Sequence, residues 1–289
     1  MNNDDRTALL EGERAGMRYA LAPPRTTTAR SAGLHAGRQA GASLEFREHR
    51  EYQPGDDLRR IDWNAFARSD KLSVKLHREE ISPHIDIVLD GSRSMGLEGT
   101  AKARAAIGLA GVFAVAAGNA GFSHRAWLAR ARCEPVVNGG LRPANWGSID
   151  LDYAGSPAEG LMKPAASFRR QGMRMLISDL LWMAEPSTIL RRLAEGACGV
   201  IVAHLLAEDD LRPVERGRAR LVDAETGEQR EVFIDDAAIG RYREALARHR
   251  QSWDQACRQA GAVLIPLVAE NLAADWNLEA FVKAELLNA

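Results

Sequence analysis

Three oxygen-bearing side chains alternate where an apolar run of the sequence ends. Residues 84–90 read HIDIVLD, and Ser92 and Ser94 follow Asp90 at every second position. In extended backbone, alternate side chains point the same way, so one carboxylate and two hydroxyls converge on one point. Hard oxygen donors gathered in this way suit Mg²⁺ or a similar divalent cation, such as Mn²⁺ or Ca²⁺. The spacing therefore favours a metal-binding loop over a group that cleaves bonds.

A second carboxylate ends another apolar run. Residues 173–179 read MRMLISD, so Asp179 closes this run as Asp90 closes the first. Ligands of open parallel sheets bind outside the carboxyl ends of the strands, where both aspartates would lie. Ser156, in the segment AGSP ahead of a predicted helix, is either a fifth oxygen donor or only the N-cap of that helix. The predicted metal ligands are Asp90, Ser92, Ser94, Ser156 and Asp179.

This donor set carries little charge for a divalent cation. The hydroxyls are neutral, so only Asp90 and Asp179 offset the cation, and Asp179 could act through a water. A metal held in this way keeps an open, electrophilic coordination position. Arg93, between the two serines, would either add attraction for an acidic group or be a spacer that faces solvent.

The same loop partly matches the nucleophile elbow of α/β hydrolases. Residues 92–96, SRSMG, follow a strand, and Asp179 and His204 come later in the Ser, Asp, His order of that class. However, the first glycine of the elbow is missing, and the strand-end aspartate would have no role in a hydrolase. A serine hydrolase that uses Ser94, Asp179 and His204 is the alternative to metal binding. Phosphate loops of the G-x-x-x-x-G-K-[ST] type and G-x-G-x-x-G turns do not occur in the sequence, so ATP or NAD binding by those routes is not expected.

Composition limits the classes of partner. The 289 residues include 38 basic and 39 acidic side chains, for a net charge of -1, so no overall attraction to nucleic acid is expected. Three cysteines without a C-x-x-C motif fit a reducing compartment, and a cytoplasmic location is the default. No apolar run reaches the length of a membrane span, and the polar start does not resemble an export signal.

Periodicity divides the chain into three parts. Residues 1–32 are expected to form a polar segment and linker with a short helix near 7–21, and 33–82 a β-rich arm. Residues 83–289 alternate apolar strands with helical patterns, which indicates an α/β domain with a mostly parallel sheet. A hairpin insertion is expected at about 212–235. The expected strands are 85–90, 124–129, 173–179, 200–206 and 262–268, and the expected helices are 100–118, 156–170, 186–195, 236–260 and 277–288.

The segment 54–63 reads PGDDLRRIDW. Its charged residues Asp56, Asp57 and Arg59 could bind a partner, but Pro-Gly forms a turn and neighbouring charges often only pair across it. The structural interpretation is favoured, with Trp63 as an apolar anchor between the arm and the sheet domain.

Two resemblances give these patterns a context. The D-x-S-x-S loop, a later Ser loop and a strand-end Asp resemble the metal-ion-dependent adhesion site of von Willebrand factor A domains. From about residue 33 onward, the chain also resembles the bacterial domain of unknown function 58 family. The motifs that carry this second resemblance are GxxxEF at 41–46, RxYxPGDDxRxIDW at 50–63, AR at 67–68 and DxETG at 223–227. Ser156 stands where adhesion sites more often have Thr, which keeps the hydroxyl.

The resemblance implies a fold and a function. It implies a von Willebrand factor A-like fold of the Rossmann-like type, and a non-enzymatic, Mg²⁺-dependent protein-interaction module whose metal binds an Asp or Glu side chain of a partner. It also implies an adaptor or chaperone-like partnership with a MoxR-type AAA+ ATPase in assembling, activating or remodelling other proteins. Many members of the family carry membrane segments ahead of this domain, and this chain is expected to be the short soluble form.

Overall fold

The chain folds into two compact units, which are described separately. A computed structural model describes residues 3–22, 46–53, 61–69, 71–77, 83–163, 168–212 and 216–289. Residues 1–25 and 83–289 form the larger unit, and residues 26–82 the smaller one.

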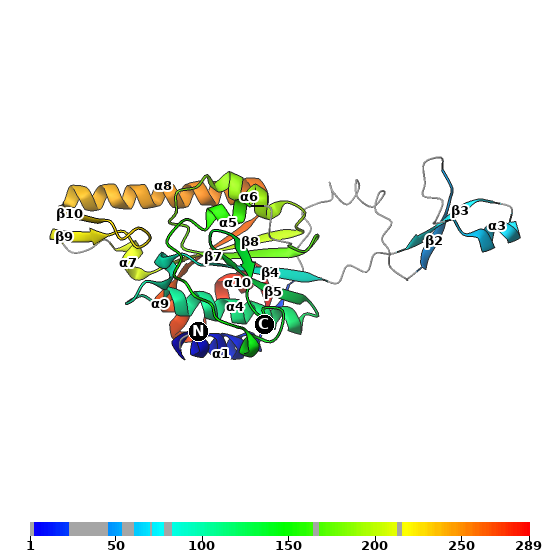
Figure 1. The fold of residues 1–289 in the computed structure, drawn as a ribbon, viewed down its shortest axis with the longest axis horizontal. Coiled ribbons are helices and arrows are strands. Elements are labelled where there is room, and N and C mark those ends of the chain that lie inside the picture. The colour runs from blue at the N-terminus through cyan, green and yellow to red at the C-terminus, as the bar shows by residue number, and fades with distance from the viewer. Residues whose placement is uncertain are drawn as a thin grey trace. The chain divides into compact units, whose positions relative to one another are not determined.

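The larger unit is built on a six-stranded, mostly parallel sheet flanked by helices (Figure 1). Only β6 runs antiparallel to its neighbour, β5. The central strand β4 is buried along its whole length, because helices cover both faces of the sheet. Its polar residues His84 and Asp86 are buried with the apolar ones and contact each other. The predicted mixed α/β class is confirmed. In spatial order the strands are β11 (Val263–Val268), β8 (Gly199–Leu206), β7 (Met173–Ser178), β4 (His84–Asp90), β5 (Ser123–Ala129) and β6 (Cys133–Pro135).

Alternate residues of β4 pack into two separate apolar cores. Ile85, Ile87 and Leu89 belong to the core beneath one face of the sheet, and Val88 belongs to the core on the other. The first core is closed by α1 (Asn3–Gly16), α4 (Lys102–Asn119), α9 (Ala269–Asp275) and α10 (Glu279–Lys283). The second is closed by α5 (Ala158–Met162), α6 (Pro186–Ala194) and α8 (Asp236–Ala260). Among the described residues, no helix combines the length and apolar character that a membrane crossing needs.

The first helix belongs to the larger unit rather than to a polar linker. Helix α1 starts and ends earlier than the predicted helix at 7–21, and it buries Ala8 and Leu9 completely. After it, β1 (Ala20–Leu21) pairs with β12 (Leu287–Asn288), so the segment that follows α1 lies beside the last strand of the chain. The expectation of a separate segment at 1–32 missed this because a narrow apolar stripe is hidden in a polar composition.

Two other predicted helices are shorter in the structure. Within the described residues of the helix expected at 156–170, the helical part is α5, which ends because Lys163 is extended, as residues before a proline usually are. The helix expected at 277–288 is reduced to α10, and the chain leaves it through Glu285, whose φ is 57°.

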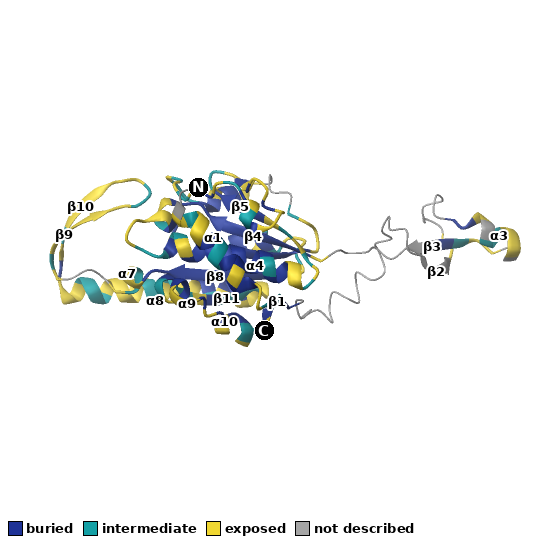
Figure 2. Ribbon diagram, turned by 90° about the horizontal axis from the view of Figure 1, so that it is seen from below, coloured by how far each residue is buried: buried dark blue, intermediate teal, exposed yellow. Residues whose placement is uncertain are grey.

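The predicted hairpin is present. Strands β9 (Gly217–Val222) and β10 (Gln229–Ile234) pair antiparallel, and the short helix α7 (Glu208–Leu211) precedes them. Most of the hairpin is exposed (Figure 2). The Asp235 carboxylate accepts from the Ala238 N–H and caps α8, the long helix that follows.

The smaller unit contains the strand pair of the predicted arm. Strands β2 (Phe46–Glu51) and β3 (Ser73–His77) are antiparallel, and a helix, α3 (Trp63–Ser69), lies between them in the sequence. Trp63, predicted to be an apolar anchor, is 60% exposed and contacts Phe66 edge-on. The candidate partner residues Asp56, Asp57 and Arg59 lie outside the described residues.

Close packing around α4 yields a test of this fold. A Cβ added to Gly108 would lie 1.8 Å from Cη2 of Trp276, whereas a Cβ on Gly118 of the same helix meets nothing within 4 Å. We expect Gly108→Ala to lower the free energy of unfolding by about 1–3 kcal/mol, because Trp276 must move. Gly118→Ala, the matched control, should leave it unchanged or raise it by up to about 1 kcal/mol. Urea denaturation measures both, and equal stability of the two variants would contradict this packing.

Candidate functional site

The D-x-S-x-S loop begins where β4 ends. Asp90 is the last residue of this strand, and Ser92 and Ser94 lie at the start of a 3-10 turn, η2 (Arg93–Gly96). Strand β7 is a parallel neighbour of β4, so Ser178 and Asp179 come to the same carboxyl edge of the sheet. The two strand-end aspartates therefore lie at one edge, as the strand pattern predicted.

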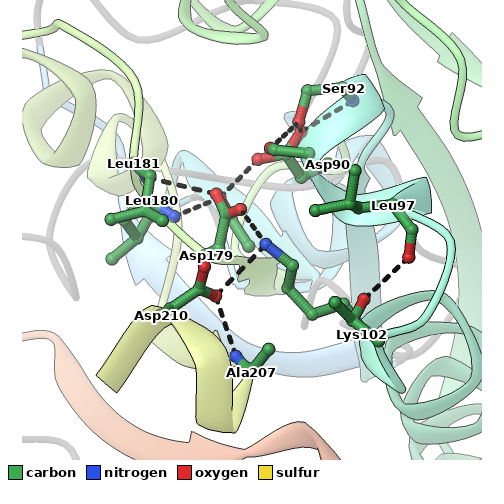
Figure 3. A network of polar contacts seen from close by, with 12 residues as sticks. Asp90, Ser92, Leu97, Lys102, Asp179, Leu180, Leu181, Ala207 and Asp210 are labelled. Carbon is green, nitrogen blue, oxygen red and sulfur yellow. Dashed lines mark hydrogen bonds and ion pairs between the residues drawn. The ribbon is translucent and has the colours of Figure 1, made fainter. Parts of the chain in front are cut away.

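One carboxylate oxygen of Asp90 holds the first serine of the loop. Asp90 Oδ1 accepts from the Ser92 N–H at 2.9 Å and from the Ser92 hydroxyl at 2.6 Å (Figure 3). The Ser92 and Ser94 hydroxyl oxygens are 3.1 Å apart. The structure thus brings together the three side chains that the sequence spacing singled out.

The other oxygen of Asp90 accepts from two residues that the sequence analysis missed. The Ser178 hydroxyl and the Trp182 indole N–H, at 2.9 Å, both donate to Asp90 Oδ2. Asp90 is 1% exposed, and burial together with the charge of Asp179 raises its pKa to about 6. A signal was available in the sequence, because Ser178 directly precedes the strand-end Asp179.

Asp179 belongs to a buried ion network. The Lys102 ammonium, 1% exposed, lies 3.0 Å from Asp179 Oδ2 and 3.2 Å from Asp210 Oδ2 (Figure 3). Burial lowers the pKa of Lys102, but the two carboxylates outweigh it and hold the pKa above its ordinary value. The ionised carboxylates of Asp90, Asp179 and Asp210 carry three negative charges against one ammonium. Two negative charges therefore remain at this edge of the sheet.

Ser156 lies on a loop that runs beside the D-x-S-x-S loop. Tyr153 exchanges backbone hydrogen bonds with Gly91 and Arg93, at 3.0 and 3.1 Å, and Ser156 follows three residues later. The Ser156 hydroxyl is buried, and no described residue forms a hydrogen bond with it. Its side chain does not cap α5, whose N-cap residue is Pro157. Of the two roles that the sequence left open, the capping role is wrong.

The donor chemistry fits a hard divalent cation. A buried hydroxyl without a partner costs free energy unless something else satisfies it, and Ser156 is such a hydroxyl. Within the described ranges, no three or more His, Cys, Asp or Glu side chains gather as a potential metal site. The candidate site instead combines three hydroxyls with two carboxylates, an all-oxygen set that suits Mg²⁺ better than a softer metal.

Ser94, Asp179 and His204, the residues of the alternative serine hydrolase, are not joined by hydrogen bonds of the kind that a catalytic triad has. In the described part of the chain, the Ser94 hydroxyl contacts Ser92, and the Asp179 carboxylate contacts Lys102 rather than His204. Burial lowers the pKa of His204 to about 4, and its Nε2 has no partner. A general base must reach the nucleophile, and none of these contacts joins Ser94 to His204.

The hairpin also contributes to this loop, which the sequence analysis did not foresee. The carboxylate of Glu225 accepts from the backbone N–H groups of Arg93 and Ser94, at 3.2 and 3.0 Å. The Arg93 guanidinium donates to the backbone carbonyls of Asp152 and Glu225, at 3.1 and 3.4 Å. Arg93, predicted to attract an acid or to face solvent, thus contacts an acidic residue of its own chain. The DxETG motif was visible in the sequence, but its position beside the loop was not.

The chain is similar to curated proteins that are described as uncharacterized. It is 27% identical, over 256 residues, to the uncharacterized proteins Rv1480 of Mycobacterium tuberculosis and Mb1516 of Mycobacterium bovis, covering 84% of this chain and 80% of each relative.

Solved structures give weaker matches. A conserved hypothetical protein, BatB from Bacteroides thetaiotaomicron, matches at 10% identity with a TM-score of 0.34, over 69% of this chain and 97% of that one. An aerotolerance-related membrane protein from Bacteroides fragilis matches at 13% identity with a TM-score of 0.39, over 69% and 98%.

The sequence profile of one family, described as protein of unknown function DUF58, matches residues 48–137 and 154–252. These ranges include all five predicted metal ligands as well as Glu225. Because they cover more than half of the sequence, the chain belongs to the DUF58 family.

Proposed function

We propose that the chain is a non-enzymatic, metal-dependent protein-interaction module of the von Willebrand factor A type. Asp90, Ser92, Ser94, Ser156 and Asp179 would hold Mg²⁺, or another divalent cation such as Mn²⁺ or Ca²⁺. The observation that carries this proposal is the buried Ser156 hydroxyl, which has no hydrogen-bond partner in the part of the chain that the structure describes. It lies on the loop that pairs with the D-x-S-x-S loop. When bound, the cation supplies an electrophilic position for a carboxylate oxygen of a partner protein.

The surrounding contacts support this proposal because they orient the donors in advance. Ser92 donates its only hydroxyl proton to Asp90, so Ser94 must be the donor in the contact between the two hydroxyls, and one lone pair of the Ser92 oxygen is left to bind a cation. Ser178 and Trp182 fix the other oxygen of Asp90, and Lys102 fixes one oxygen of Asp179. Outer contacts of this kind orient metal ligands and tune their affinity. The net charge of two negative units at this edge matches a divalent cation.

The proposed partner is a MoxR-type AAA+ ATPase, as the family resemblance implies. The ATPase would supply energy from ATP, and this chain would supply recognition of the proteins to be assembled, activated or remodelled. That the ATPase rather than this chain binds ATP agrees with the sequence, in which the G-x-x-x-x-G-K-[ST] and G-x-G-x-x-G motifs do not occur.

Removal of the Asp90 charge tests the metal site. We expect the wild-type chain to bind Mg²⁺ in isothermal titration calorimetry and Asp90→Asn to lose detectable binding, because the carboxylate that orients Ser92 and offsets the cation is gone. Asn keeps the size of the side chain, but its NH₂ group must face donors of either Ser92 or Trp182, so circular dichroism must first show that the variant is folded. Asp254→Asn is the control, since that carboxylate pairs with Arg258 on α8. Equal Mg²⁺ affinity of Asp90→Asn and wild type would refute the site.

Ser156→Ala separates ligand binding from stability. Because the buried hydroxyl has no hydrogen-bond partner among the described residues, its loss should leave the free energy of unfolding of the metal-free chain unchanged or raise it by about 1 kcal/mol. The same change should weaken Mg²⁺ binding by about tenfold or more, as loss of a ligand-shell interaction does. Calorimetric titration and urea denaturation of one preparation give both quantities. Unchanged Mg²⁺ affinity would remove Ser156 from the ligand set.

Mg²⁺ affinity should depend on pH through Asp90. Burial and Asp179 raise the pKa of Asp90 from 3.8 to about 6, so protons compete with the cation below that pH. We expect binding to be about tenfold weaker at pH 5 than at pH 7. The free energy of unfolding of the metal-free protein should change in the opposite direction. Because the folded state raises the pKa of Asp90, the contribution of Asp90 to that free energy falls as pH rises from about 4 to 6. Titrations at pH 5, 6 and 7 check this, and a constant affinity would contradict the role of Asp90.

A further inference from the structure

We propose that Glu225, at the tip of the β9–β10 hairpin, is the chain's own acidic ligand for the face of the D-x-S-x-S loop. A partner that reaches this face must displace the hairpin tip, and the partner it fits is a short acidic turn like the tip itself. Hydrogen bonds between Glu225 and the residues Arg93 and Ser94 support the docking of the tip. The competition with a partner's acid rests on the proposed function.

The contact joins two parts of the chain that are far apart in sequence. Glu225 Oε1 accepts from the Ser94 N–H at 3.0 Å, and Oε2 accepts from the Arg93 N–H at 3.2 Å. The guanidinium of Arg93 completes the contact by donating to the Glu225 backbone carbonyl. Both amides belong to the loop that carries the candidate metal ligands Ser92 and Ser94. A carboxylate bound there occupies the face at which an external carboxylate would arrive.

Burial along the hairpin singles out the tip. Ala224 and Glu225 are half-buried, whereas residues 220–223 and 226–231 are exposed. Within the described residues, β9 and β10 form a two-stranded sheet of their own, separate from the central sheet. Phe233, on the second strand, is 69% exposed. Glu225 is therefore less exposed than most of the turn around it, as its contact with the loop requires.

The tip is a turn that is built to present Glu225. The Asp223 carboxylate accepts from the N–H groups of Glu225 and Thr226, at 3.0 and 2.7 Å. Gly227, with φ of 72°, donates to the Asp223 carbonyl at 2.9 Å, and a non-glycine residue would be strained there. This turn fixes the backbone on both sides of Glu225 and leaves its side chain free to reach the loop. A partner with the same turn chemistry would compete for the same amides.

Amide hydrogen exchange tests the docking without any metal. The Ser94 N–H is the reporter, because the Arg93 N–H is shared with the Tyr153 carbonyl. In the full chain, we expect Glu225→Ala to speed exchange of the Ser94 amide at least tenfold. Glu228→Ala, the matched control, removes the neighbouring carboxylate that pairs with Arg230 and should leave the amide as protected as in wild type. Equal exchange in wild type and Glu225→Ala would overturn the docking.

A peptide tests the displacement. The probe is the synthetic peptide LVDAETGEQ, which copies residues 221–229, and its control carries Gln in place of the central Glu. With Mg²⁺ present, we expect the probe to bind Glu225→Ala at least tenfold more tightly than wild type, and the Gln peptide to bind neither. Equal binding of the probe to both proteins, or no binding to Glu225→Ala, would overturn the competition.

The two proposals fail in different ways. If calorimetry detects no Mg²⁺ binding but the Ser94 amide depends on Glu225, the metal-dependent function is wrong and the docking of the tip stands. If Mg²⁺ binds through Asp90 but the Ser94 amide does not depend on Glu225, the docking is wrong and the metal site stands.

Discussion

The Asp90 carboxylate is almost completely buried, and both of its oxygens are satisfied by hydrogen bonds from the chain. Moving an ionised carboxylate out of water is costly unless donors replace the lost hydration. Here the donors are two groups of Ser92, the Ser178 hydroxyl and the Trp182 indole. These contacts join the end of β4 to the D-x-S-x-S loop, to the end of β7 and to the loop after it. The geometry of the site follows from the need to stabilise this one charge.

The same constraint explains the charged residues around Asp90. A second carboxylate, Asp179, ends the adjacent strand, and the two acids at one buried edge raise the pKa of Asp90. Lys102 compensates part of this charge by pairing with Asp179 and Asp210. A bound cation would neutralise the remaining negative charge. It would also give the Ser156 hydroxyl oxygen, which has no partner among the described residues, a group to bind. In the proposed function this negative charge offsets the cation, and the Glu225 carboxylate contacts the loop on which a partner's acid would arrive.

The sequence predicted those features that depend on local pattern. Continuous apolar runs identified the buried parallel strands, and the position of Asp90 and Asp179 at the ends of two runs placed them at one edge of the sheet. Features that depend on tertiary contact were not predictable in this way. Helix α1 looked like part of a polar linker because the face that it buries consists mostly of small residues, such as Ala8, Gly12 and Ala15, which give little hydrophobic signal. Lys102 and Glu225 carry side chains that are ordinarily solvated, so nothing local marked them as neighbours of the site.

The central claim is that hydroxyls from two loops and the aspartates behind them hold a divalent cation. Anomalous scattering from crystals of the full chain grown with millimolar Mn²⁺ tests it most directly, because the peak locates the ion without assumptions about function. We expect a peak within ligand distance of the Ser92, Ser94 and Ser156 hydroxyl oxygens. Crystals without a peak at this edge of the sheet, and with the Ser156 hydroxyl bound to a protein group instead, would contradict it.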